Sequence, residues 1–166
     1  MTSQVDEYLL PGLIVASIGA LSIALIAQYG YGFEPCVLCS YQRIPYVAVV
    51  IFGAIGLHVE GCDRLGVATL LGVVFALGAA LAFYHVGVEQ HWWAAATSCG
   101  GGSGSYFQDF KNFIANPLKG LNKRCDEIDW TLFGLSMTVY NVAASLSLAL
   151  VSFAGAYQAN KDQGHG

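Results

Sequence analysis

The feature that most constrains this chain is a set of long apolar stretches that carry almost no charge. The clearest runs from Tyr8 to Phe33 without one charged residue, and about 20 such residues are enough to cross a bilayer as a helix. Four spans are predicted in all, over residues 9–28, 36–58, 65–84 and 131–157. The predicted fold is therefore an all-α membrane protein, a bundle of four transmembrane helices forming one domain over residues 1–166.

The composition supports a lipid bilayer as the surrounding partner and argues against a nucleic-acid partner. Only 11% of the residues are charged, whereas soluble domains carry about 25%, and the mean hydropathy is +0.55. The net charge of −4 and the absence of a basic run exclude the electrostatic footprint that nucleic acid requires.

The second span begins with two cysteines and holds an arginine. Cys36 and Cys39 are three residues apart, and Arg43 follows four residues after Cys39. If this segment is helical, Cys39 and Arg43 share a face, and a guanidinium there favours the reactive thiolate. An alternative is that Arg43 extends to the lipid headgroups. Pro45 removes a backbone hydrogen bond and predicts a kink.

A long polar segment, residues 85–130, separates the last two predicted spans and carries Cys99 and Cys125. Aromatic residues at helical spacing within residues 106–114 predict a short amphipathic helix on the bilayer surface. Four spans place both termini on one side of the membrane, with the Cys36 segment and the long segment together on the other.

The cysteines on that side allow three interpretations: a zinc site, structural disulfides or redox-active disulfides. Zinc sites use paired Cys-x-x-Cys motifs or added histidines, whereas Cys99 and Cys125 stand singly, so we predict no metal. The Cys36–Cys39 spacing is typical of redox-active dithiols, which favours the third interpretation. Cys62 lies on the opposite side and is predicted to be a bystander.

Three polar residues fall in or at the end of the later spans. His85 and Glu89 are four residues apart at the end of the third span, where they either move protons or simply form a polar helix end. Asn141 lies in the fourth span and is predicted to form an interhelical hydrogen bond.

Three stretches, in this order, resemble the DsbB family of bacterial inner-membrane disulfide oxidoreductases, and its alphaproteobacterial branch in particular. The resemblance covers nearly the whole chain. The matching residues are Cys36-Val37-Leu38-Cys39 with Tyr41-Gln42-Arg43, then Tyr84-His85-x-Gly87-Val88-Glu89, then Arg124-Cys125-Asp126-Glu127 followed by Trp130, Leu132-Phe133-Gly134-Leu135-Ser136-Met137 and Asn141.

The resemblance implies a quinone-dependent enzyme whose four catalytic cysteines work as two pairs. Cys99 and Cys125 would form a disulfide that a periplasmic DsbA-like thioredoxin-fold partner attacks, and Cys36 and Cys39 would pass the electrons to ubiquinone or menaquinone. The residues implied at the quinone are Cys39, Arg43, His85 and Glu89.

The resemblance also implies that the thiol loops face the periplasm. The positive-inside rule gives the opposite orientation, because five basic residues lie on the thiol side and two on the side of the termini. We adopt the periplasmic orientation, since disulfides form in oxidising compartments.

Two other functions remain as alternatives. One is a vitamin K epoxide reductase-like enzyme, which the Cys-x-x-Cys on the second span argues against. The other is a membrane scaffold whose disulfides are structural and inert.

Overall fold

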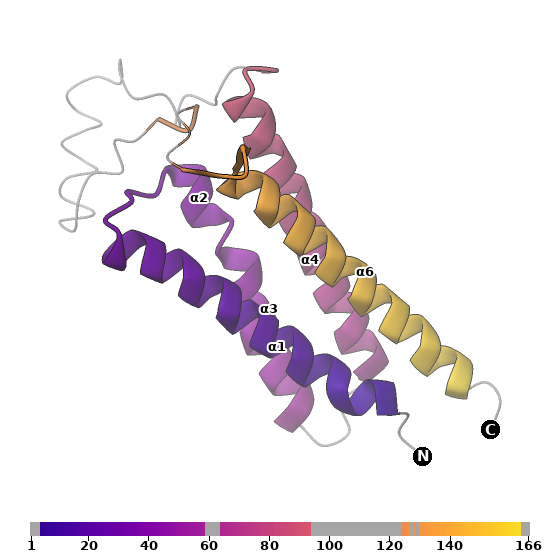
Figure 1. Ribbon diagram of the computed structural model, residues 1–166. Coiled ribbons are helices and arrows are strands. Elements are labelled where there is room, and N and C mark those ends of the chain that lie inside the picture. The colour runs from indigo at the N-terminus through magenta and orange to yellow at the C-terminus, as the bar shows by residue number, and fades with distance from the viewer. Residues whose placement is uncertain (1–3, 59–63, 94–123, 127, 129, 164–166) are drawn as a thin grey trace, which may run out of the picture.

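The computed structural model describes residues 4–58, 64–93, 124–126, 128 and 130–163, and it shows a bundle of membrane-spanning helices (Figure 1). The helices are α1 (Gln4–Leu25), which continues as the π-helical turn η1 (Ile26–Gly30), α2 (Val37–Tyr41), α3 (Ile44–His58), α4 (Arg64–Glu89) and α6 (Met137–Gln163). Four segments are long and apolar enough to cross a membrane: Tyr8–Gly30, Val37–His58, Leu65–Glu89 and Met137–Lys161. The prediction of an all-α, four-helix membrane protein is confirmed.

Both ends of the described chain lie at the same end of the bundle, and α2, which carries the first cysteines, lies at the other end (Figure 1). This follows from the even number of membrane crossings. The cysteine end is therefore one pole of the molecule, and the termini mark the opposite pole.

The helices pack through buried apolar residues and close contacts at glycines. The central cluster includes Phe75, Leu71 and Val49, which are inaccessible to solvent. At Gly155 an added Cβ would lie 2.4 Å from the side chain of Leu9, so α1 and α6 approach each other more closely than a larger residue would allow. Small residues provide such close approach in membrane bundles.

The second span is not one helix but two, α2 and α3, joined by a turn at Gln42 and Arg43. Pro45 explains the break because it has no N–H to continue the hydrogen-bond ladder of α2. Near the start of α3 the same proline is tolerated, and the ladder resumes with the bond from Val47 N to the Arg43 carbonyl (3.1 Å). Where a kink was predicted, the helix of the second span is interrupted by a turn.

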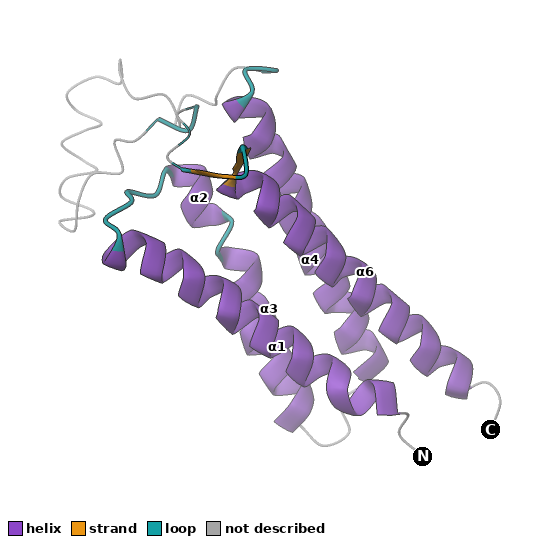
Figure 2. Ribbon diagram, in the orientation of Figure 1, coloured by secondary structure: helices purple, strands orange, loops and turns teal. Residues whose placement is uncertain are grey.

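A small β-hairpin precedes α6, formed by β1 (Thr131–Leu132) and β2 (Leu135–Ser136) (Figure 2). Its two turn residues, Phe133 (φ 51°) and Gly134 (φ 80°), both have positive φ, as a type I′ hairpin turn requires. The fourth span therefore starts at Met137 rather than at residue 131.

The third span differs from the prediction at its other end, because α4 continues beyond residue 84 to Glu89. His85 and Glu89 are buried in this extension, of which Glu89 is the last residue, and other elements supply their hydrogen-bond partners. Cys62, Cys99 and the predicted surface helix at residues 106–114 lie outside the described residues.

Candidate functional site

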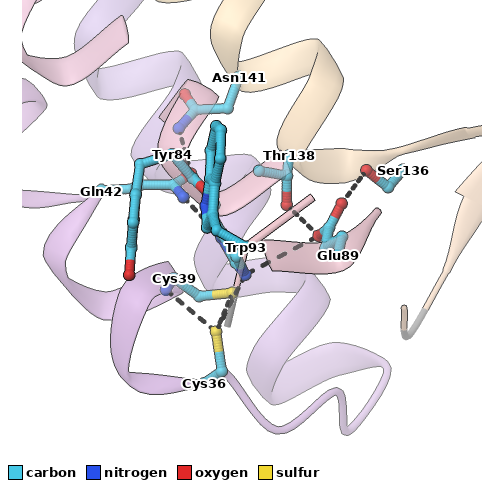
Figure 3. A network of polar contacts seen from close by, with 10 residues as sticks. Cys36, Cys39, Gln42, Tyr84, Glu89, Trp93, Ser136, Thr138 and Asn141 are labelled. Carbon is cyan, nitrogen blue, oxygen red and sulfur yellow. Dashed lines mark hydrogen bonds and ion pairs between the residues drawn. The ribbon is translucent and has the colours of Figure 1, made fainter. Parts of the chain in front are cut away.

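The first two cysteines meet at the N-terminus of α2. Cys36 is the N-cap of this helix, and its sulfur accepts a hydrogen bond from the backbone N–H of Cys39 (3.2 Å) (Figure 3). The two sulfur atoms are 2.8 Å apart, closer than two non-bonded sulfur atoms ordinarily approach but longer than a disulfide bond of about 2.05 Å. Cys36 is buried and Cys39 is partly buried. Only a small movement separates this arrangement from a disulfide.

Cys125 belongs to the same end of the bundle. It is buried and packs in one apolar cluster with Cys36, Leu38 and Val88, with Cys39 at the edge of that cluster. Three of the four predicted redox cysteines are thereby brought together from segments far apart in the sequence. The fourth, Cys99, lies outside the described residues.

The residues on either side of Cys125, Arg124 and Asp126, form an ion pair. The guanidinium of Arg124 binds both carboxylate oxygens of Asp126, at 3.0 and 2.6 Å. This fork-like pairing holds the pKa of Asp126 below its usual value. The ion pair also links the residues on either side of Cys125 to each other.

His85 links the sulfur atoms to α4. The ring is buried, with its Nε2 atom 3.6 Å from the sulfur of Cys36. The side-chain amide nitrogen of Gln42 lies 2.7 Å from Nδ1 and donates to it. Because Nδ1 is then an acceptor, the proton of the neutral ring resides on Nε2 and faces Cys36.

Glu89 lies one helical turn after His85 and is also buried. Its two carboxylate oxygens accept hydrogen bonds from the hydroxyls of Ser136 (2.6 Å) and Thr138 (Figure 3). The hairpin and the first turn of α6 supply these donors. Oε1 is also 3.8 Å from Nε2 of His85, so the ring lies between a sulfur and a carboxylate.

Arg43 lies in the turn between α2 and α3, and its Nη1 donates to Oε1 of Gln28 (2.6 Å). Gln28 is in the π-helical turn η1, a type of irregularity often found at functional sites. The interruption of the helix means that Arg43 is not held against Cys39 by simple helical spacing. Both residues nevertheless line the same cavity.

That cavity has a volume of about 290 Å³ and lies between all four spans. One wall is apolar, with Ala20, Leu21 and Ala24 from α1, and the other carries the polar groups of the cysteine end. Its polar lining includes Cys36, Cys39, Gln28, Gln42, Arg43, His85 and Glu89. The cavity thus offers an apolar slot that leads to sulfur atoms, a cation and hydrogen-bond donors.

Cys36, Cys39 and His85 also form a group of three atoms that could hold a metal, all within 4.8 Å of one another. The hydrogen bond from Gln42 to Nδ1 opposes this use, because it leaves the proton on the nitrogen that would have to bind the ion. The arrangement suits thiol chemistry better than zinc.

Several residues of this end were not singled out by the sequence as site residues. They are Gln28, Gln42, Tyr46, Ser136 and Thr138. Polar side chains inside apolar spans are the signal that could have found them, since such groups seek one another in a bilayer. The predicted interhelical hydrogen bond of Asn141 is confirmed, since it donates to Gln42 and accepts from Tyr46.

Comparisons with known proteins show the family of this chain. Residues 7–155 match the family model described as "Disulfide bond formation protein DsbB". The chain is 34% identical over 140 residues to a Disulfide bond formation protein B of Methylobacillus flagellatus, covering 82% of this chain and 84% of the relative. It is 35% identical over 145 residues to a protein of the same name from Acinetobacter baumannii, covering 84% of each. No solved structure gave a significant match.

The family match extends over nearly all the described helices and over each of Cys36, Cys39 and Cys125. The chain therefore belongs to the DsbB family of disulfide bond formation proteins.

Proposed function

We propose that this protein is a quinone-dependent thiol–disulfide oxidoreductase that reoxidises a DsbA-like dithiol protein. The observation that carries the proposal is the meeting of Cys36, Cys39 and Cys125 at one end of the bundle, beside a cavity with an apolar wall. Overall, the dithiol partner loses two electrons and two protons, and a membrane quinone gains them to become a quinol.

The thiol half of the reaction is a series of disulfide exchanges. In the proposed sequence the partner's thiolate attacks a Cys99–Cys125 disulfide at Cys99, and the released Cys125 attacks Cys36 of a Cys36–Cys39 disulfide. Cys39 then leaves as a thiolate. The partner's second thiol displaces Cys99 and leaves the partner oxidised, and Cys99 then displaces Cys36 from Cys125, which restores the Cys99–Cys125 disulfide. Cys36 and Cys39 are left reduced, and their two electrons pass to the quinone as the Cys36–Cys39 disulfide forms again. The shared apolar cluster supports the second exchange, because Cys125 needs no large movement to reach Cys36.

The cavity fits a quinone by the chemistry of its lining. Quinones have an apolar body and two carbonyl oxygens, and small-molecule sites are typically apolar with a few well-placed polar groups. Arg43 is the cationic donor of the lining, while Cys39 supplies electrons and His85 and Glu89 are placed to exchange protons. A bound quinone supplies the electron-accepting ring; this chain orients it and keeps water out.

The proposed location is the bacterial inner membrane, with the cysteine end facing the periplasm. The ends of the described chain lie at the opposite pole from α2 (Figure 1), so this orientation puts both of them on the cytoplasmic side. An oxidising compartment at the cysteine end is what disulfide formation requires.

The test is oxidation of a reduced DsbA-like protein by the purified protein in detergent, with ubiquinone or menaquinone as the electron acceptor. The matched variants are Cys39→Ser and Cys62→Ser, which make the same replacement inside and outside the site. We expect turnover in the wild type and in Cys62→Ser, and none in Cys39→Ser.

The same assay separates the alternatives. A scaffold with inert disulfides shows no turnover with either quinone although its disulfides are intact. A vitamin K epoxide reductase-like enzyme would reduce the epoxide with a dithiol as reductant, which can be measured on the same preparation.

A further inference from the structure

A chain of side-chain hydrogen bonds crosses the bundle behind the cysteine site. It begins at Tyr46 on α3, whose hydroxyl donates to Oδ1 of Asn141 on α6 (2.5 Å). Asn141 donates through Nδ2 to Oε1 of Gln42, and Gln42 donates through Nε2 to Nδ1 of His85 (2.7 Å). Asn141 and Gln42 therefore each accept at one atom and donate at another, and the chain ends on the ring beside Cys36.

Burial raises the energetic cost of breaking or mismatching a hydrogen bond in this chain. Gln42 and His85 are buried, as is Tyr46, and no buried side-chain nitrogen or oxygen in the described part of the protein lacks a hydrogen-bond partner. If either amide turned over alone, donor would face donor or acceptor would face acceptor at the contact between Gln42 and Asn141. Such a mismatch is costly in a buried site, so the members of the chain keep one common direction.

The far end of the chain selects that direction. Nε2 of His85 faces the sulfur of Cys36 at 3.6 Å and a carboxylate oxygen of Glu89 at 3.8 Å. Both are acceptors, so a proton on Nε2 is favourable there and a lone pair is not. A reversed chain would put the proton on Nδ1 and aim the Nε2 lone pair at the carboxylate.

We propose that Gln42, held in place by Asn141, is a positioning residue that keeps neutral His85 in the tautomer with its proton on Nε2. The ring then presents a fixed N–H donor to the sulfur of Cys36. Gln42 donates to the His85 ring and Asn141 donates to Gln42, so both act through His85.

The donor has a use in the thiol chemistry, and this part of the inference rests on the proposed function. A hydrogen bond to a sulfur favours its negatively charged form. Cys36 already accepts the backbone N–H of Cys39 as the N-cap of α2, and the His85 N–H is a second donor from a different helix. Cys36 leaves as a thiolate when its disulfide with Cys125 is broken later in the cycle, and the negative charge that develops on Cys36 in that step would be stabilised by both donors.

The test is long-range ¹H–¹⁵N NMR of the full-length protein labelled at histidine nitrogens in detergent micelles. This experiment distinguishes a nitrogen that carries a proton from one that does not, and His85→Asn assigns the signals by their loss. In the wild type with reduced cysteines we expect His85 to be protonated at Nε2, with an unprotonated Nδ1 shifted by a hydrogen bond. A wild-type ring protonated at Nδ1 overturns the proposal.

Two substitutions at position 42 test the role of the amide. Gln42→Glu replaces the donor by a carboxylate of the same shape, and we expect Nδ1 of His85 to gain a proton. Gln42→Met removes the donor without adding a charge, and we expect the Nδ1 signal to move to the position of a nitrogen without a hydrogen bond. If one variant fails to fold, the other and the wild type still decide the question.

Matched controls are Gln158→Glu and Gln158→Met, which change an exposed glutamine on α6 far from the cysteine pole. They should leave the His85 signals in place, and identical spectra for the position 42 and position 158 variants contradict the proposal. The NMR readout does not depend on turnover. If the wild type is inactive but His85 is protonated at Nε2, only the proposed function is refuted. If the wild type is active but His85 is protonated at Nδ1, only this inference is refuted.

Discussion

Gly87 lies on α4 between His85 and Glu89, and its replacement by alanine tests how the cysteine end of that helix is held. The chain reverses after α4 through His91, which has a φ of 57°, and returns Trp93 onto Gly87. An alanine Cβ at this position would lie 1.9 Å from Cζ2 of Trp93. No side-chain contact is that short, so the Trp93 ring has to leave its place.

The cost follows from what Trp93 contacts. Its indole N–H donates to the carbonyl of Tyr84 (3.0 Å), and its ring stacks on the Tyr84 ring with centroids 5.8 Å apart. A hydrogen bond of this kind contributes about 0.5–1.5 kcal/mol and an aromatic pair about 0.5–1.5 kcal/mol. Together the loss is about 1–3 kcal/mol if both contacts disappear.

Gly12→Ala is the matched control, because Gly12 is also helical and an added Cβ there meets nothing within 4 Å. Any gain in helix propensity, about 1 kcal/mol, is common to both variants. We therefore expect Gly87→Ala to be about 1–3 kcal/mol less stable than Gly12→Ala. The assay is reversible unfolding in mixed detergent–SDS micelles, with tryptophan fluorescence as a second readout. Equal stability of the two variants, with unchanged fluorescence, would refute the close packing of Trp93 on Gly87.

Three further predictions concern the site. Arg43→Met should raise the KM for quinone while leaving disulfide exchange with the dithiol partner near its wild-type rate. Gln28→Leu should have the same effect more weakly, because Gln28 acts by holding the guanidinium of Arg43. Steady-state quinone titrations measure the KM, and stopped-flow mixing with the partner measures the exchange rate. Thr138→Val removes one hydroxyl donor from the Glu89 carboxylate and should lower the free energy of unfolding by about 1 kcal/mol, within the range for hydrogen bonds in membrane proteins. Cys62→Ser should retain full turnover, because Cys62 is expected at the opposite pole from the other cysteines.

Controls of the same chemical type sharpen these measurements. Arg64→Met removes an arginine at the start of α4, at the other pole, and should leave the KM for quinone unchanged. Thr69→Val removes an exposed hydroxyl that donates to the Leu65 carbonyl within its own helix. Comparable losses in the site variants and these controls would count against the assigned roles, and inactivity of Cys62→Ser would contradict the proposed topology.

The overall architecture was predictable from the sequence because a bilayer leaves a chain few choices. Long uncharged stretches must become helices that satisfy their own backbone groups, and four of them place the termini together. The hairpin before α6 was missed because the Phe133–Gly134 turn requires positive φ at a phenylalanine, which is rare. The apolar residues around that turn read as the beginning of a helix.

The site was predictable only in part, for a reason that lies in its hydrogen bonds. Spacing alone placed Cys36 near Cys39 and His85 near Glu89, since each pair is local in the sequence. The partners of these residues come from far along the chain, as with Gln42 and His85. No local pattern encodes such pairings. The role of Arg43 at Cys39 and the pairing of Cys99 remain predictions.

The division of the second span into α2 and α3 separates two tasks that a single helix would have to combine. α3 is fifteen residues long and includes Val49 in the apolar core, so it is the part that anchors this span. α2 has only five residues and sets the distance between the two sulfurs. Mutations in the core of α3 should accordingly lower the stability of the protein in the membrane far more than they change the rate of thiol–disulfide exchange.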